Sequence, residues 1–83
     1  MDKEARAILS RANLGETIYS SLSEIIWNGW LEISARGDNA TNHPRPVLAA
    51  LCEMAAESEG IRVETHLIEK RFNVSRSYKS WLP

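Results

Sequence analysis

The chain has 83 residues, a length that favours a single domain over residues 1–83 with a small hydrophobic core. Its hydrophobic fraction of 43% argues against intrinsic disorder, and its one cysteine, Cys52, excludes an intramolecular disulfide. The net charge of −1 is unevenly distributed, because residues 1–60 hold five basic and nine acidic side chains, whereas residues 61–83 hold five basic and two acidic ones. A basic C-terminal quarter suits a nucleic-acid contact surface, and it is also compatible with a solvated helix face.

The first residues, M-D-K-E-A-R, lack the apolar core of a signal peptide. The apolar runs elsewhere are only a few residues long, far short of the roughly 20 residues that a membrane-spanning helix needs. We therefore expect a cytoplasmic protein that does not associate with membranes.

The N-terminal part of the chain predicts two helices. Ala5 and Ile8 belong to an apolar stripe at helical spacing, which predicts a helix near residues 3–12. An Asn-Leu-Gly tripeptide then favours a C-cap or a kink. A longer helix is predicted near residues 17–34, although Ser21 and a glutamate three residues later have capping-box spacing, so the helix could begin there instead.

Residues 25–33 are ambiguous between a helix and a hairpin. Asn28-Gly29 between apolar residues is a hairpin signal. The preceding Ile-Ile-Trp does not alternate as a half-buried strand would, so we expect a helix. Within a helix, Gly29 costs about 1 kcal/mol relative to alanine. We expect another helix to approach closely at that glycine.

The second helix is apolar almost all round its C-terminal half. In so small a domain, part of that surface needs cover from outside the monomer. We expect either a homodimer through this helix or a protein partner docked on it. The expected interface residues are Ile26, Trp27, Trp30 and Leu31.

The middle of the chain predicts a loop followed by a third helix. Gly, Pro, Asn and Asp cluster over residues 36–45, which is typical of a loop. The helix is predicted over residues 46–59, with Pro46 in its first turn and Gly60 at the left-handed position after its end. Residues 61–64 alternate briefly, as a short strand or an extended connector would.

The sequence shows no pattern typical of an enzyme or a metal centre. His43 and His66 lie far apart and, with the single Cys52, form no metal-ligand spacing. A glycine-rich phosphate loop and a nucleophile elbow are both absent from the sequence. We therefore expect a protein that is not an enzyme, with no catalytic residues, no metal and no cofactor.

The C-terminal segment, residues 65–82, predicts a pair of short helices. The first spans residues 65–72 and places Ile68 and Phe72 on one face. An Asn-Val-Ser break separates it from a second helix over residues 75–82, whose outer positions are polar. The fold expected for the whole chain is therefore all-α, a small bundle of four to five helices that ends in a helix-turn-helix-like pair.

From Ile68 onward this pair resembles the helix-turn-helix DNA-binding proteins, a broad class with the pattern Leu-Ala-x-x-Phe-Gly-Val-Ser-x-x-x-Val-x-x-x-Leu. Asn73 stands at the turn glycine of that pattern and Glu69 at its small residue, and the second helix is short. The resemblance implies contacts with bases and phosphates. The residues that it assigns to nucleic-acid binding are Lys70, Arg71, Ser75, Arg76, Ser77 and Lys79.

Two functions are compatible with these patterns. The first is a small DNA-binding transcriptional regulator that uses the C-terminal pair. The alternative is a protein-binding inhibitor or adaptor, of the kind that phages and plasmids encode, which docks its tryptophan-rich helix on a larger protein. In the second case the C-terminal pair is a helical hairpin that simply closes the core.

Overall fold

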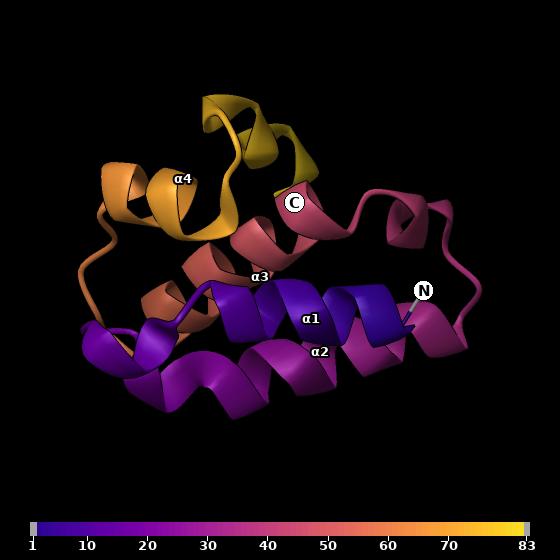
Figure 1. Ribbon diagram of the computed structural model, residues 1–83, viewed down its shortest axis with the longest axis horizontal. Coiled ribbons are helices and arrows are strands. Elements are labelled where there is room, and N and C mark those ends of the chain that lie inside the picture. Colours follow the sequence, from indigo (N-terminus) through magenta and orange to yellow (C-terminus); the bar gives the residue numbers. More distant parts are fainter. Residues whose placement is uncertain (1, 83) are drawn as a thin grey trace.

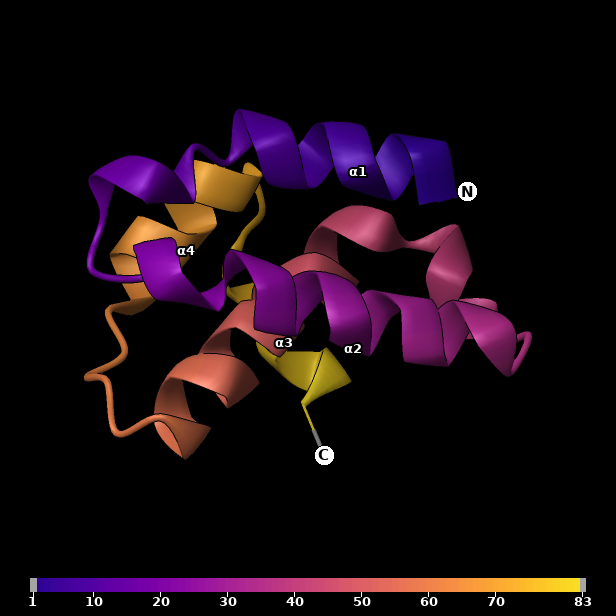
Figure 2. The same cartoon turned by 90° about the horizontal axis from the view of Figure 1, so that it is seen from below.

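The computed structural model describes residues 2–82, which form the expected all-α bundle (Figure 1). α1 (Asp2–Arg11) and α2 (Ser23–Ala35) run antiparallel in both views (Figure 2). α3 (Pro44–Ser58) contacts α1, α2 and α4 (Thr65–Phe72), so it is the helix around which the bundle is assembled. Within the described residues, no helix combines the length and the apolar character that crossing a bilayer requires.

Within residues 2–82, four short 3₁₀ helices complete the bundle: η1 (Leu14–Glu16), η2 (Ser20–Leu22), η3 (Asn39–Asn42) and η4 (Arg76–Trp81). The first two connect α1 to α2, the third lies between α2 and α3, and η4 packs on α3. The core between these elements is dominated by large side chains that are fully buried. The bulkiest of them are Trp30, Tyr19, Tyr78, Phe72 and Leu22.

Several predicted boundaries are confirmed within a residue or two. The helix predicted near residues 3–12 is α1, and the helix predicted over residues 65–72 is α4. Gly60 takes the left-handed conformation at φ 71°, and the N–H of Ile61 donates back to the carbonyl of Ala56 at 2.8 Å. This is the expected end of α3. Residues 61–64 form an irregular connector that ends with Glu64 in an extended conformation, and the described residues contain no strand.

The prediction of one helix over residues 17–34 is wrong in its first part, because α2 begins only at Ser23. Thr17 explains the delay. Its hydroxyl donates to the carbonyl of Leu14 at 2.8 Å and accepts from the N–H of Tyr19 at 3.0 Å. These local bonds stabilise two 3₁₀ turns in competition with the α-helix. Residues 25–33 are helical, so the hairpin alternative is excluded.

The loop predicted over residues 36–45 is shorter than expected. It contains η3, which is capped by Asp38, whose Oδ1 accepts from the N–H of Ala40 at 2.8 Å. The third helix begins at Pro44 rather than Pro46, because both prolines tolerate the first turn, where an N–H has no intrahelical partner.

Gly29 lies where α2 approaches α3, as expected. A Cβ at this position would lie 3.1 Å from Cδ2 of Leu51 in α3. The absence of a side chain therefore lets the two helices pack closely along that line.

Candidate nucleic-acid interface

The turn between α4 and η4 contains a residue in the left-handed conformation. Asn73 adopts the left-handed conformation at φ 55° and ψ 53°, which ends α4 and redirects the chain. The carbonyl of Glu69 accepts from the N–H groups of both Asn73 and Val74. Asparagine thus adopts here a backbone conformation that glycine also adopts readily.

Ser75 caps the second element of the pair. Its backbone is extended and its hydroxyl accepts from the N–H of Ser77 at 3.4 Å, a long hydrogen bond. The two hydroxyls also lie 2.6 Å apart. The predicted polar cap is therefore present, and both serine side chains face solvent.

The element that follows is a 3₁₀ helix rather than the α-helix predicted over residues 75–82. Tight winding brings residues three apart onto the same side of the element. Tyr78 and Trp81 have this spacing. The Tyr78 hydroxyl donates to Glu53 in α3, and the Trp81 ring packs against His43, the residue before α3, at a ring-centroid distance of 5.3 Å. Satisfying both contacts favours the tighter helix.

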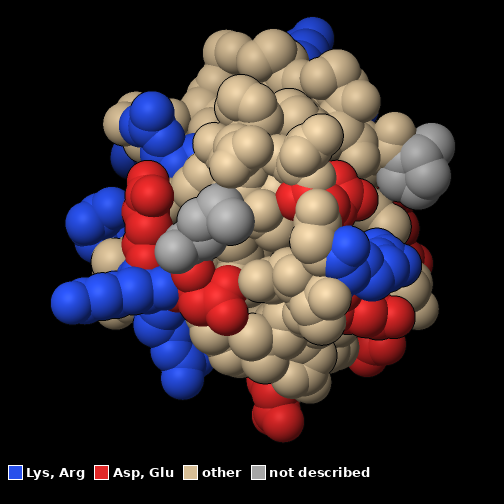
Figure 3. Space-filling model, turned by 90° about the vertical axis from the view of Figure 1, so that its right-hand side faces the viewer, with Lys and Arg blue, Asp and Glu red and all other residues tan. Residues whose placement is uncertain are grey.

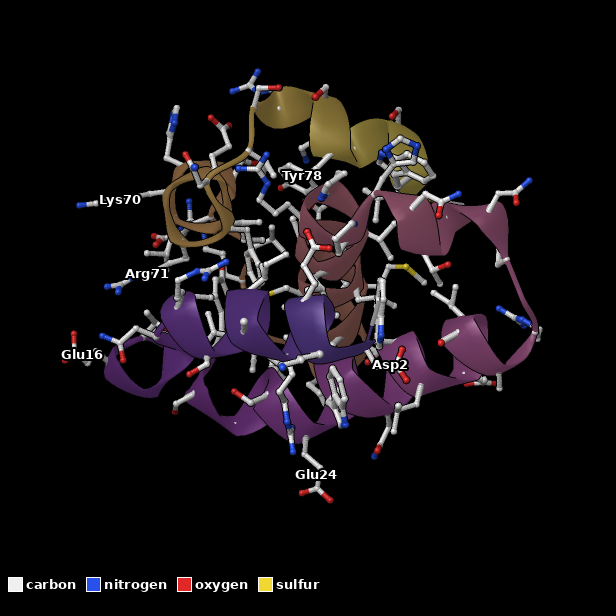
Figure 4. All side chains as sticks on the ribbon, turned by 45° about the vertical axis from the view of Figure 1, so that its right-hand side comes forward. Asp2, Glu16, Glu24, Lys70, Arg71 and Tyr78 are labelled. Atoms are coloured by element: carbon white, nitrogen blue, oxygen red, sulfur yellow. The ribbon has the colours of Figure 1, made fainter. Side chains whose placement is uncertain are left out.

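A buried carboxylate anchors η4 to α3. The hydroxyl of Tyr78 donates to Oε1 of Glu53 at 2.6 Å, and the ammonium of Lys79 lies 3.2 Å from the same oxygen. Tyr78 lies between η4 and α3 (Figure 4). Burial, together with the hydrogen bond to the carboxylate of Glu53, raises the pKa of Tyr78. Lys79, a predicted DNA contact, is thus engaged in holding η4 in place.

The other predicted contacts face solvent to different degrees. Arg76 is the most available cation of η4, since its side chain is 68% exposed and its Nε lies 3.9 Å from Oε2 of Glu69, too far for a hydrogen bond. Lys70 is exposed and Arg71 is half-buried. Both lie side by side at the end of α4, on the side of the molecule where α1 ends (Figure 4).

Two further cations meet Lys70 and Arg71 at a cavity of about 300 Å³ between α1, α3 and α4. Arg11 comes from the last turn of α1 and Arg45 from the first turn of α3. The remaining lining residues are Ile8, Phe72 and Asn73. Arg11 and Arg45 were not among the predicted contacts, because they belong to the acidic part of the sequence and only the fold brings them to α4.

The connector before α4 is held by Tyr19. The Tyr19 hydroxyl donates to the carbonyl of Arg62 at 3.3 Å and accepts from the N–H of Glu64 at 2.6 Å. Burial raises the pKa of Tyr19. The start of α4 is therefore positioned by a side chain from the connection between α1 and α2.

The predicted protein interface on α2 is wrong for two of its four residues. Ile26 and Trp30 are fully buried, and the indole N–H of Trp30 donates to Oδ1 of Asp2 at 3.0 Å. α1 and α3 pack against α2 and cover these two positions, so no outside partner is needed there. Trp27 is half-buried with the guanidinium of Arg6 4.6 Å above its ring, and Leu31 remains exposed.

A different apolar surface opens between α2, α3 and the end of η4. A groove of about 370 Å³ is bordered there by Ile33, Leu51, Met54 and Trp81, with Arg36 and Asp38 among its other lining residues. On the side of the molecule that bears the loop between α2 and α3, uncharged surface is flanked by charges of both signs (Figure 3).

Cys52 is a core residue, as its position in the third helix suggests. It is fully buried, and burial raises the pKa of its thiol to about 12, so the thiol is protonated near neutral pH. Among the described residues, no group of three or more His, Cys, Asp and Glu side chains could hold a metal ion.

Comparison with protein-family models, curated proteins and solved structures gives no match to this chain.

Proposed function

We propose that the protein is a small DNA-binding regulator whose contact edge comprises the end of α4, the turn at residues 73–75 and the start of η4. The observation that carries this proposal is the turn itself. Left-handed Asn73 and the Ser75 cap direct two short helices away from each other, with exposed Lys70 and Arg76 on either side of the turn.

Each part of the edge has a distinct role in this proposal. Lys70 and Arg71 contact phosphates, because they extend from the end of α4 with no ion pair within residues 2–82. Arg76, next to the hydroxyls of Ser75 and Ser77, donates to guanine edges in the major groove. We assign Lys79 to the anchor on Glu53 rather than to DNA.

The length of η4 limits sequence specificity. Six residues at the 3₁₀ rise of about 2 Å per residue give roughly 12 Å, the span of three to four base pairs. We expect electrostatic attraction to phosphates to supply most of the affinity.

Fluorescence anisotropy with a labelled mixed-sequence duplex at low salt tests the proposal. Wild-type protein should bind, and Arg76→Gln should weaken binding. Arg36→Gln removes the same charge at the far end of α2 and should bind like wild type. Absence of binding to any duplex at 50 mM salt, or equal losses in the two variants, would refute the proposal.

We propose a second candidate function, docking of an apolar segment of a partner protein, because the groove beside Met54 and Trp81 is open and mostly apolar. Met54→Gln should abolish a nuclease-resistant complex recovered from host lysate. Ile18, the most exposed large apolar side chain within residues 2–82, lies outside that groove, so Ile18→Gln should leave the complex intact. If the two substitutions reduced recovery of the complex equally, the groove would be excluded as the docking site.

A further inference from the structure

The cavity between α1, α3 and α4 gathers four positive charges, and no acidic side chain of the described residues lines it. Its lining includes Arg11, Arg45, Lys70 and Arg71 and contains no Asp or Glu. Within residues 2–82, none of the four forms an ion pair or donates a side-chain hydrogen bond. A cluster of like charges destabilises the fold unless an anion neutralises it.

Helix electrostatics explain three of these cations but not the fourth. Arg11 lies in the last turn of α1, and Lys70 and Arg71 lie in the last turn of α4, where the helix dipole favours positive charge. Arg45 lies in the first turn of α3, where the dipole disfavours it. Neither the dipole of α3 nor an acidic residue in its first turn therefore offsets the repulsion between Arg45 and the other three cations.

Arg71 supplies a second, independent observation. Its Nε atom is buried and has no hydrogen-bond partner within residues 2–82. A buried donor without an acceptor is costly, so an acceptor bound in the cavity would stabilise Arg71. The amide of Asn73, which also lines the cavity, offers further donors.

We propose that this cavity is a binding site for a phosphate group. Three guanidinium groups and one ammonium match an oxyanion that carries several acceptor oxygens and up to two charges. The phosphate could come from the end of a nucleic-acid strand or from a free nucleotide, and both present the same tetrahedral oxyanion. The site shares Lys70 and Arg71 with the proposed duplex contacts, whereas Arg11 of α1 and Arg45 of α3 belong to this site alone.

Inorganic phosphate is the first probe, titrated at constant pH and ionic strength against chloride. The ¹H–¹⁵N signal of Arg71 Nε should shift in a saturable manner, and the melting temperature should rise with phosphate but not with chloride. Arg45→Gln should raise the melting temperature of the free protein at low salt and weaken phosphate binding about tenfold or more.

Arg62→Gln is the matched control, since it removes one exposed cation outside the cavity and should leave phosphate binding unchanged. Arg11→Gln, at an exposed position that lines the cavity, provides a second variant with the same expected loss as Arg45→Gln. Phosphate effects equal to those of chloride, or equal losses in the Arg45 and Arg62 variants, would overturn the proposal.

The source of the phosphate is distinguished by comparing a nucleoside monophosphate with two single strands, one 5′-phosphorylated and one with a 5′-hydroxyl. Preference for the phosphorylated strand identifies a nucleic-acid end, and preference for the mononucleotide identifies a free nucleotide. Either result supports the site. Phosphate binding without duplex binding would keep the site and refute the proposed regulator.

Discussion

Tyr78→Phe removes one oxygen atom from the contact that anchors η4. The hydroxyl lost by this substitution donates to Glu53 at 2.6 Å in a buried setting. Hydrogen bonds to charged groups contribute about 1.5–3 kcal/mol net. The loss of stability in the variant should lie in the upper part of that range. The remaining partner of the Glu53 carboxylate is Lys79, whose side chain is 39% exposed, and a solvent-exposed cation compensates a buried carboxylate only weakly.

This loss is large for a chain of 83 residues. At about 0.05–0.15 kcal/mol per residue, the free energy of unfolding is about 4–12 kcal/mol in total. Each kcal/mol corresponds to about 4–8 °C of melting temperature in a domain of this size, so a loss of about 2–3 kcal/mol should lower the melting temperature of Tyr78→Phe by about 8–24 °C.

Circular dichroism at 222 nm, with heat and with urea, measures the effect. The urea m-value should stay constant, which shows that the denatured state is unchanged. A double-mutant cycle with Glu53→Gln then isolates the Tyr78–Glu53 coupling, because glutamine keeps the shape but loses the charge. A melting temperature within about 2 °C of wild type would refute the idea that this hydrogen bond anchors η4.

Three further predictions test the core, a turn and an acidic anchor. Trp30→Ala should destabilise the fold by about 3–5 kcal/mol in urea unfolding, and a small effect would return Trp30 to the list of interface residues. Gly60→Ala should lower the free energy of unfolding by about 1–2 kcal/mol because φ is positive at this position. Gly15→Ala should be close to neutral, since an added Cβ meets no atom within 4 Å at either glycine and the left-handed strain is absent at Gly15. Hydrogen bonds from Ser34 and Trp30 lower the pKa of Asp2, so its contribution to stability is present above pH 3.8 and is lost as pH falls through the lowered value. Asp2→Asn should therefore be less stable than wild type at pH 7, and the urea midpoints of the two proteins should converge as pH falls below the lowered pKa of Asp2.

The elements that could be predicted are those whose signals are local. Gly60 and Asn73 sit at left-handed positions, which few other residues tolerate, and the apolar stripes of α1 and α4 are regular. Periodicity alone did not predict the break before α2. That break depends on the Thr17 hydroxyl, whose hydrogen bonds compete with a helix that the apolar pattern also permits.

The candidate site was only partly predictable for a different reason. Periodicity placed Trp30 on an apolar helix, but only the packing of α1 shows that the indole lies inside and bonds Asp2. Likewise Arg11 and Arg45 are 34 positions apart, and no spacing rule connects them before the three helices are assembled. The bond from Lys79 to Glu53 joins α3 to η4 and is equally non-local.

The salt dependence of duplex binding tests the central claim most directly. The observed binding constant should fall with salt with a slope of about −0.9 per phosphate contact. Lys70→Gln with Arg71→Gln removes the two phosphate contacts assigned to the end of α4, so the slope should become shallower by about 1.8, while Arg36→Gln should leave it unchanged. A double variant with the wild-type slope, or wild-type protein that leaves every duplex unbound at 50 mM salt, would contradict a DNA-binding edge at the turn between α4 and η4.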